Sequence, residues 1–416
     1  MRELTEQEIV RRQKVDEIRK TCNPYPERYE ITHTLKEASN LEDGTDNVSV
    51  AGRIVFMRKM GKMSFIKVRD IEADLQISIK VDLVGEEKYQ FFKSNFDVGD
   101  FIGATGEIFT THTGEKTLRA SSFEFLGKAL KPLPEKFHGL TDKELCYRNR
   151  YVDMIMNEDT RKNFLIRMNF IRELRRFLDS KGYYEVETPI LNNKPSGAVA
   201  KPFMAHHNAL DMDVYLRIAP ETYMKRSVIA GIPKVYEIAR CFRNEGMDAT
   251  HLQDFTMIEA YQAYYNYEDN MKFIRELLQT VIGKVFGTLN IQIGDKMVDL
   301  SGEWGRVSFR DLIMKYSNID INEYNTKEKL LSKIKEDKIE LDSETPIENL
   351  GYGNLVDYLY KKVARPHMLG PVYLTEHPMS LSPLARANDD NKEITDRFQL
   401  VINGVEIVNG YSELVD

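Results

Sequence analysis

The residues best suited to chemistry lie together in residues 235–264, which read VYEIARCFRNEGMDATHLQDFTMIEAYQAY. Residues 235–244 are rich in β-forming side chains, and residues 255–264 alternate between apolar and polar ones. The polar stretch between them, residues 246–254, is short enough to connect a hairpin. The sequence therefore predicts two antiparallel strands joined by a loop.

Side chains two apart in a strand share a face. The predicted site face therefore carries Arg243 and Glu245 from the first strand and Phe255, Met257, Glu259 and Tyr261 from the second. A guanidinium is a planar, permanently charged fork for a phosphate or carboxylate, and Phe255 offers a stacking face for a base. A solvated salt-bridge surface would explain the charges, but it would not explain Phe255 and Met257 among them. We therefore expect a site for a nucleotide whose phosphate is attacked.

Two motifs in this stretch, FRNEG and HLQDFTMIE, resemble the second signature motif of class II aminoacyl-tRNA synthetases. The tyrosine at 261, two residues after Glu259, is similar to the pattern of the lysine-specific members. The implied reaction is lysine plus ATP giving lysyl-adenylate, followed by transfer of lysine to tRNA(Lys). The resemblance implies that Arg243 is the catalytic residue, binding the lysine carboxylate and the α-phosphate. It also implies that Glu245, His251 and Phe255 bind ATP together with Arg243, with Phe255 stacked on adenine.

The resemblance further implies a lysine-binding set from several parts of the chain: Gly197, Glu221, Arg243, Glu259, Tyr261, Asn409, Tyr411 and Glu413. Gly197 and Glu221 would hold the α-amino group, although Glu221 also reads as a helix-start carboxylate after Pro220. Asn409, Tyr411 and Glu413 share a predicted strand face. Glu413 and Tyr261 would contact the ε-ammonium, which fits the need of a buried ammonium for a paired anion.

A magnesium site is expected beside the ATP, with Mg²⁺ as the cofactor. The family has a metal-binding carboxylate where this chain has Gln399, which leaves Glu406 as the matching ligand. A glutamine carbonyl can coordinate Mg²⁺ but brings no charge. Glu406 has the opposite strand parity to Asn409, so a bulge near Val408 is needed if Glu406 faces the site.

Upstream, five short strands are predicted at residues 48–56, 63–70, 74–81, 100–111 and 115–126, with a helix at 86–95. Five strands with a helix before the fourth indicate a small Greek-key barrel of the oligonucleotide-binding (OB) type. The motif GRIVFMRKMGKMSF resembles the anticodon-binding barrel of lysyl-tRNA synthetases. That resemblance implies that Phe65, Gln76 and Glu115 contact the anticodon bases, by the stacking and hydrogen bonding that read single-stranded RNA.

The expected architecture is a multidomain α+β chain. Residues 1–47 form an N-terminal helix and lead-in, 48–130 the OB-fold barrel and 131–149 a linker. Residues 150–416 form a class II catalytic domain, an antiparallel sheet flanked by helices, with a helical insertion at about 305–368. A basic flank on the first helix is either solvated or RNA-facing: Arg11, Arg12, Lys14, Arg19 and Lys20. The helix and strand of residues 164–191 resemble the family's first signature motif, which implies a homodimer through them.

Composition narrows the class of protein. The 416 residues carry a net charge of −7, with 42% hydrophobic and 30% charged residues, which is typical of a globular protein. Three scattered cysteines, Cys22, Cys146 and Cys241, suit neither a disulfide framework nor a metal knuckle. The charged start and the lack of a long apolar stretch argue against a signal peptide and a membrane span. We therefore expect a cytoplasmic protein with no membrane partner.

The third signature motif of the family, a Gly-rich strand and helix with an arginine over adenine, has no counterpart up to Asp416. We therefore expect the C-terminal part of the sheet to be missing, and adenylate formation to be slower than in a complete enzyme. One alternative is a catalytically impaired fragment or pseudo-synthetase that binds lysine or tRNA. A second alternative, a protein-modifying lysyl ligase, would lack the N-terminal barrel. A third, an aspartate or asparagine synthetase, would need an arginine in place of Glu413 or Tyr261 to bind an acidic substrate.

Overall fold

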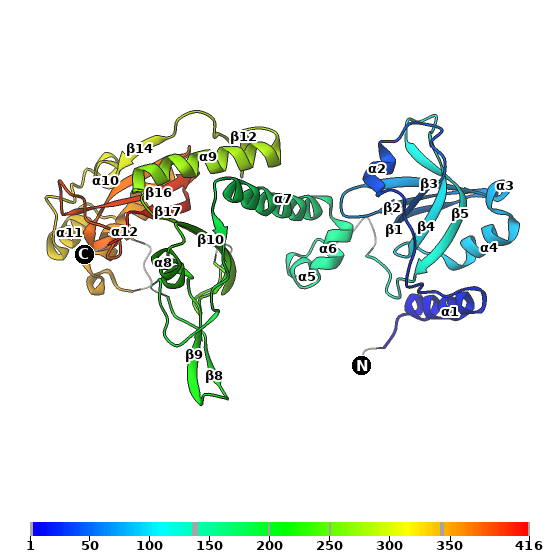
Figure 1. Cartoon of the computed structure of the whole chain (residues 1–416), viewed down its shortest axis with the longest axis horizontal. Helices are drawn as coiled ribbons and strands as arrows, with labels where there is room; N and C mark the ends of the chain where they lie inside the picture. The colour runs from blue at the N-terminus through cyan, green and yellow to red at the C-terminus, as the bar shows by residue number, and fades with distance from the viewer. Residues whose placement is uncertain (1–2, 135–139, 199, 249–250, 342–344, 415–416) are drawn as a thin grey trace. The chain divides into compact units, whose positions relative to one another are not determined.

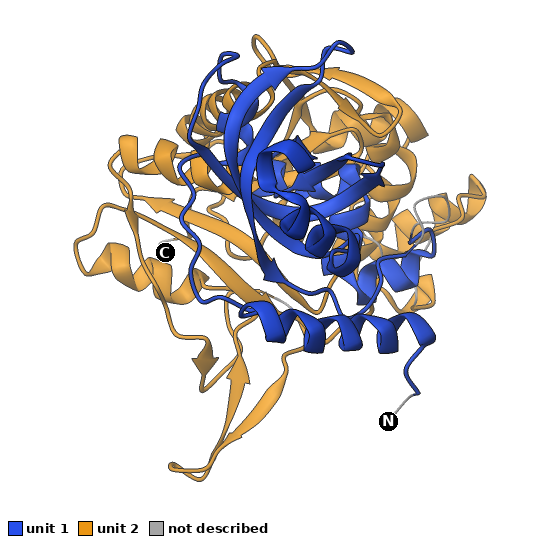
Figure 2. Cartoon of the chain, turned by 90° about the vertical axis from the view of Figure 1, so that its right-hand side faces the viewer, with its two compact units in different colours: residues 1–168 blue, residues 169–416 orange. Residues whose placement is uncertain are grey.

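The computed structural model describes residues 3–134, 140–198, 200–248, 251–341 and 345–414. The chain divides into two compact units, Met1–Met168 and Asn169–Asp416, which Figure 2 colours separately. Each unit has its own hydrophobic core. The long helix α7, Glu158–Ser180, runs across the boundary between them.

The first unit is built on a closed barrel with the strand order β1-β2-β3-β5-β4. Its strands are β1 Val48–Lys59, β2 Met63–Arg69, β3 Asp74–Lys80, β4 Phe101–Thr110 and β5 Lys116–Gly127. Two helices, α3 Val81–Val84 and α4 Glu86–Asn95, connect β3 to β4 (Figure 1). The predicted five-stranded barrel with a helix before its fourth strand is confirmed.

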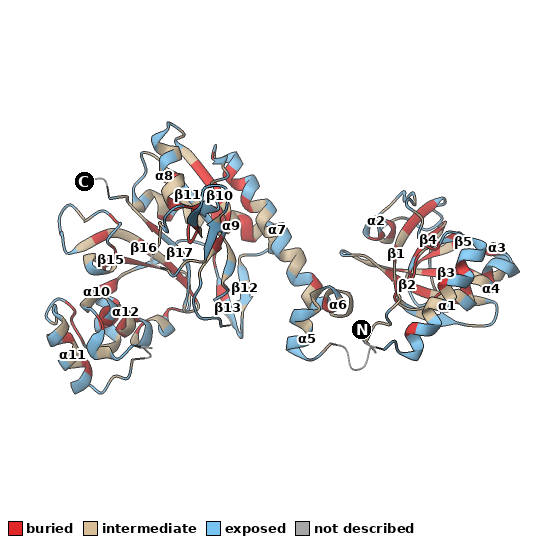
Figure 3. Ribbon diagram, turned by 90° about the horizontal axis from the view of Figure 1, so that it is seen from below, coloured by how far each residue is buried: buried red, intermediate tan, exposed pale blue. Residues whose placement is uncertain are grey.

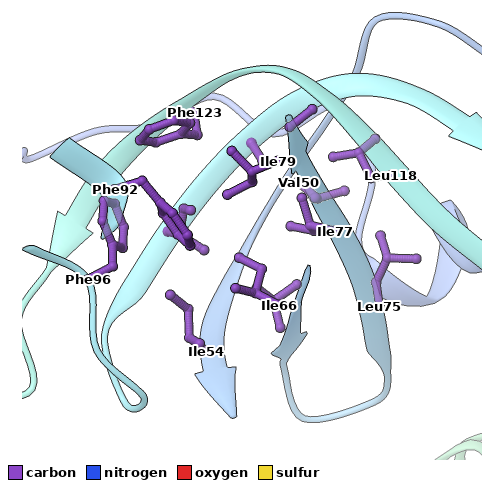
Figure 4. Packing of buried hydrophobic residues seen from close by; sticks show 14 of the residues in the cluster. Val50, Ile54, Ile66, Leu75, Ile77, Ile79, Phe92, Phe96, Leu118 and Phe123 are labelled. Atoms are coloured by element: carbon purple, nitrogen blue, oxygen red, sulfur yellow. The ribbon is translucent and has the colours of Figure 1, made fainter. Parts of the chain in front are cut away.

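Alternation along the barrel strands fills its interior with branched and aromatic side chains. In β2, Ser64, Ile66 and Val68 are fully buried, while the residues between them are partly exposed. Helix α4 contributes Phe92, and Phe96 follows at its end, so that aromatic rings close one end of the core (Figure 4). The period-two pattern that predicts these strands is therefore the pattern of inward-facing residues.

Helix α1, Glu6–Thr21, is held against the barrel by ion pairs. Lys14 Nζ lies 2.7 Å from an oxygen of Asp97, and the Arg11 guanidinium donates to the carbonyl oxygens of Val98 and Ala129. The basic flank was open to two interpretations, solvated or RNA-facing, and the structure gives a third role to Arg11 and Lys14. They anchor the helix to its own barrel.

The segment that follows the barrel, predicted as a linker at residues 131–149, contains helix. Helix α5, Lys143–Arg148, lies inside that range, and α6, Arg150–Met156, follows it directly. Asp142 caps α5 through its side chain, which accepts from the backbone N–H of Leu145. A short helix with such a cap leaves only a weak periodic signal in the sequence. The lead-in before the barrel contains one further helix, α2 Leu35–Ser39.

The predicted hairpin is confirmed in the second unit. Strand β10, Lys234–Phe242, pairs with β11, Asp254–Gln262, in antiparallel register. The first strand ends two residues before the predicted limit of 244. Strand β6, Tyr184–Glu185, adds to β10 in parallel. Nearby, β7 Leu191–Asn192, β8 Met204–His207 and β9 Met212–Leu216 form a small separate sheet, and helix α8, Glu221–Ile229, begins directly after Pro220.

A second sheet has the order β14-β15-β16-β17. Its strands are β14 Gly305–Ser308, β15 Val372–Pro378, β16 Ile394–Ile402 and β17 Val405–Tyr411. Helix α9, Tyr267–Phe286, contacts β16 and β17, and the short hairpin β12 Asn290–Ile293 with β13 Lys296–Asp299 follows it. Most neighbouring strands in these two sheets pair in antiparallel register, as predicted. In the described residues β11 and β17 are both edge strands, and each larger sheet contains one parallel pair.

The region predicted as a helical insertion at about 305–368 begins with strand β14, so its helical part starts at Phe309. It comprises α10 Phe309–Ser317, α11 Lys327–Glu336 and α12 Tyr352–Val363, together with short 3₁₀ turns at Ile347–Asn349 and Arg365–His367. A third 3₁₀ turn, Met379–Leu381, follows strand β15. Leu330 and Ile334 of α11 are buried, whereas the other residues of that helix are exposed or partly exposed (Figure 3). None of the described helices has the length and apolar character needed to cross a lipid bilayer.

Candidate active site

The hairpin register builds the first part of the site. Glu237 lies opposite Glu259, and Cys241 lies opposite Phe255. Because opposite residues in an antiparallel pair project to the same face, Arg243, Phe255, Glu259 and Tyr261 share one surface. Glu259 is four residues from Phe255, roughly 13 Å along the strand.

Arg243 lies just past the end of β10, where its backbone N–H donates to the carbonyl of Gln253 at 2.8 Å. Its guanidinium carbon is 5.1 Å from the centre of the Phe255 ring, which fixes the fork over an aromatic face. Its Nε is buried, and among the described residues no acceptor lies within hydrogen-bonding reach of it. A buried donor without a partner is costly, so this atom is suited to an anionic ligand.

Glu245 and His251, the other residues predicted to bind ATP, lie in the connection between the strands. Glu245 Oε1 accepts from the backbone N–H of Lys201 at 3.2 Å. The His251 Nδ1 lies 2.8 Å from an oxygen of Asp248, and both side chains are exposed. The structure therefore places both on the loop that continues from Arg243, and the roles assigned to them stay predictions.

A cluster of carboxylates forms the second part of the site. Glu221 is the first residue of α8, and Lys225, one turn later, places its Nζ 2.7 Å from Glu221 Oε1. The same Nζ lies 2.6 Å from Glu413 Oε2. The Tyr411 hydroxyl donates to Glu221 Oε1 at 3.1 Å. Two predicted lysine-binding carboxylates and one predicted phenol are thus joined around a single ammonium.

Lys225 was not among the predicted site residues. The signal that could have identified it is its spacing of four from Glu221, which places both side chains on the same side of a helix. Burial alone would lower the pKa of Lys225. The hydrogen bonds to Glu221 and Glu413 outweigh that effect and raise the pKa, so the group is an ammonium ion.

Gly197 lies against the same helix start. Its φ is +87°, a conformation that side-chain-bearing residues rarely adopt. A Cβ at this position would come within 3.0 Å of the Glu221 Cβ and 3.1 Å of the Ala219 Cβ. Only glycine therefore lets this turn approach Glu221 so closely, which accords with the predicted proximity of the two residues.

Glu259 and Tyr261 complete the carboxylate cluster from the hairpin side. The Tyr261 hydroxyl donates to Glu259 Oε2 at 2.9 Å. Burial raises the pKa of Glu259 to about 7, with a smaller contribution from the carboxylates of Glu221 and Glu237 and against the opposing Tyr261 hydrogen bond. Burial also raises the pKa of Glu413. Such perturbed carboxyl groups are typical of functional sites.

A third group of polar side chains lies on β16 and β17. The pairing slips between Leu400 and Val401, whose partners are Val408 and Glu406, so Ile407 is the extra residue of a bulge. This confirms the predicted bulge near Val408. It turns Glu406 to the face of Gln399, and the Gln399 Nε2 donates to Glu406 Oε2 at 2.8 Å.

Two further contacts tie this group to the sheet. Gln399 Oε1 lies 3.2 Å from the His377 Nε2. Burial lowers the pKa of His377 to about 3, so its ring is neutral. Asn409, which is predicted to bind lysine, accepts a hydrogen bond from the Arg397 Nε through its Oδ1 at 2.8 Å. The role assigned to Asn409 in lysine binding stays a prediction.

The Glu406 carboxylate is suited to a magnesium ion whose other ligands are phosphate oxygens and water molecules. Glu406 supplies one carboxylate, and Gln399 orients it through the amide hydrogen bond. Within the residues that the structure describes, no group of three or more His, Cys, Asp or Glu side chains could hold a metal by itself. Mg²⁺ commonly uses one or two carboxylates together with substrate phosphates, so one carboxylate is sufficient chemistry here.

On the barrel, the three residues predicted to contact the anticodon share one outer face. Phe65 and Lys67 are two apart on β2, and Lys67 lies opposite Gln76 of β3. Lys67 Nζ is 2.9 Å from Glu115 Oε1, and Gln76 Nε2 donates to the Thr117 hydroxyl at 2.8 Å. A half-buried aromatic ring, a lysine, an amide and a carboxylate on one face suit unstacked bases.

Comparison with known proteins decides the family. Residues 142–416 match the family "tRNA synthetases class II (D, K and N)", and residues 48–126 match "OB-fold nucleic acid binding domain". The chain is 40% identical to the lysine–tRNA ligase of Bacillus subtilis, an alignment that covers 100% of this chain and 84% of the relative. The chain belongs to the lysine–tRNA ligase family.

Other members of this lysine–tRNA ligase family give the same result. The chain is 41% identical to the lysine–tRNA ligase of Thermosipho africanus, over 98% of this chain and 82% of the relative. It is 42% identical to the lysine–tRNA ligase of Carboxydothermus hydrogenoformans, in an alignment that covers 100% of this chain and 84% of the relative. The predicted fold class, an OB-fold barrel followed by a class II synthetase domain of mixed α and β structure, is confirmed.

Proposed function

We propose that this chain activates L-lysine with ATP and transfers the lysyl group to tRNA(Lys), with Arg243, the carboxylate cluster and the barrel face in separate roles. The observation that carries the proposal is the cluster itself. The carboxylates of Glu221, Glu259 and Glu413 converge on one face with two tyrosine hydroxyls. An amino acid with two ammonium groups is the substrate that such a pocket would bind most strongly.

In the activation step, a carboxylate oxygen of lysine attacks the α-phosphorus of ATP, the bond to the bridging oxygen breaks and pyrophosphate leaves. Arg243 would contact both the lysine carboxylate and the α-phosphate and so align them for in-line attack. Its buried Nε and its fixed position over Phe255 support this role. Most of the rate gain would come from positioning and charge stabilisation.

Glu245 and His251 would hold the nucleotide, and Phe255 would stack on adenine. Class II synthetases generally use Mg²⁺ with ATP. Here Glu406 would hold the ion, with Gln399 orienting that carboxylate, and the bound ion would neutralise charge on the departing pyrophosphate. In the transfer step, a hydroxyl of the terminal tRNA ribose attacks the lysyl carbonyl and AMP leaves.

The barrel would bind the anticodon through Phe65, Gln76 and Glu115. We also propose a homodimer formed through residues 164–191 and a location in the cytoplasm. Large apolar side chains in that segment support the dimer, because Tyr184 is 64% exposed, Ile190 43% and Leu191 49%. Such a patch on a catalytic unit is typical of a subunit interface.

The proposal is tested by Glu413→Gln, which keeps the shape of the side chain and removes its charge. The KM for lysine should rise about 10- to 100-fold, the cost of a hydrogen bond to a charged group, because the ε-ammonium loses its anion. The KM for ATP should remain nearly constant. Steady-state ATP–pyrophosphate exchange measures both, and equal changes in the two values would show that Glu413 does not select the amino acid.

A further inference from the structure

The ammonium of Lys225 occupies the centre of the carboxylate cluster. It lies 2.7 Å from Glu221 and 2.6 Å from Glu413, and 5.9 Å from the centre of the Tyr411 ring. The Lys225 side chain is 31% exposed, whereas the side chain of Glu221 is 10% exposed. These three neighbours, a carboxylate pair and an aromatic ring, are the chemical groups that would receive a lysine side chain from solution.

The two ion pairs of Lys225 differ in how they are held. Lys225 and Glu221 are four residues apart on α8, so the helix itself keeps them adjacent. Glu413 comes from the segment after β17, far away in the chain, and only the fold brings it to Lys225. The Lys225–Glu413 contact can therefore break while the Lys225–Glu221 contact stays.

Charge counting favours such an exchange over expulsion of Lys225. When ionised, Glu221, Glu259 and Glu413 bring three negative charges, and Lys225 brings one positive charge. Substrate lysine adds two ammonium groups, and its carboxylate is matched by Arg243. The cluster is therefore neutral with lysine bound only if Lys225 remains beside it, which avoids an unpaired buried charge.

We propose that Lys225 is an internal substitute for the side-chain ammonium of the substrate. Before the amino acid binds, the Lys225 ammonium pairs with Glu413. When lysine binds, the substrate ammonium takes the place of Lys225 at Glu413, and Lys225 stays paired with Glu221. This inference rests on the proposed function. Two consequences follow. Lys225 competes with lysine and weakens its binding, and it keeps Glu413 paired when an amino acid without a side-chain ammonium enters.

The test compares Lys225→Met with the unmodified protein by calorimetry. Methionine is a good helix former of similar length, so α8 should be preserved. The Kd for lysine should fall on the order of tenfold, equivalent to one competing charge-assisted hydrogen bond. The Kd for norvaline, whose chain ends before the ammonium position, should rise because Glu413 loses its partner. Lys225→Arg, which keeps the competing cation, should leave both values within a few-fold.

A neighbouring charge provides the matched control. Arg226 is on the same helix, is exposed and contacts the Tyr223 ring rather than the cluster. Arg226→Met should therefore leave both affinities unchanged if the effect is local. Weaker or unchanged lysine binding by Lys225→Met, or a shift of both ligands in the same direction, would overturn the inference. Failure of the unmodified protein to bind lysine would instead overturn the proposed function, and the inference with it.

Discussion

The protonation state of Glu259 affects how strongly the carboxylate cluster binds a cation. Its pKa is raised to about 7, because burial and the carboxylates of Glu221 and Glu237 disfavour its ionised form. The carboxyl group is therefore mostly neutral at pH 6 and mostly ionised at pH 8. The charged groups that act on it are the carboxylates of Glu221 and Glu237 and the ammonium of Lys225. A substrate ammonium favours the ionised form, so binding and deprotonation are coupled.

Lysine affinity should consequently increase with pH through the neutral range. For a pKa of about 7, the ionised fraction changes about tenfold between pH 6 and pH 8, and the Kd for lysine should fall by a similar factor. Glu259→Gln should remove this step and leave a nearly flat profile. Calorimetric titrations at half-unit pH intervals measure both proteins. A step that persists in Glu259→Gln would assign the titration to another group.

At the scale of elements, α1 and the barrel are joined by a buried ion network. Lys128 Nζ lies 2.6 Å from Asp97 and 2.7 Å from Asp100, and the side chains of Lys128 and Asp100 are both 0% exposed. Lys14 of α1 binds the other oxygen of Asp97. Removing the central cation would leave the buried Asp100 with only the more distant Arg11 guanidinium, 3.9 Å away, as an ion-pair partner.

Lys128→Met should therefore lower the free energy of unfolding by about 3 kcal/mol, the typical cost of breaking a buried pair from one side. Urea unfolding of the full chain, followed by circular dichroism, measures this change. The pair between Lys116 and Asp43 on the barrel surface serves as the control, because Asp43 is 51% exposed. Lys116→Met should cost less than about 1 kcal/mol. Equal losses would mean that burial of the network is unimportant.

The barrel face also makes a prediction at this scale. Phe65→Ala should weaken tRNA binding by roughly 1–3 kcal/mol, the value of one base stack, while lysine-dependent ATP–pyrophosphate exchange stays nearly intact. Filter binding measures the first quantity. A comparable loss of exchange would show that Phe65 supports folding instead.

Patterns between neighbouring residues in the sequence predicted individual strands, helices and turns. Alternation and glycine punctuation gave the barrel and the hairpin, and strand parity gave the bulge that turns Glu406. The contact of Lys225 with Glu413 could not be predicted in this way, because it depends on how α8 and β17 meet. How the strands of the second unit divide among separate sheets could not be predicted for the same reason, since no local signal states which strand edges pair.

At the scale of the whole molecule, two units carry two chemistries. The first presents stacking and hydrogen-bonding groups on a barrel, and the second presents the arginine, the carboxylate cluster and Glu406. Selection of the amino acid would therefore reside in the second unit alone, and selection of the tRNA would require both.

The central claim is that the carboxylate cluster selects lysine for activation. It is tested most directly by ATP–pyrophosphate exchange measured in parallel with each of the twenty amino acids and without tRNA. Lysine should support exchange well above every other amino acid, and Glu413→Gln should reduce that preference by about 10- to 100-fold. Exchange supported best by aspartate or asparagine, or equal exchange with lysine and uncharged amino acids, would contradict the account.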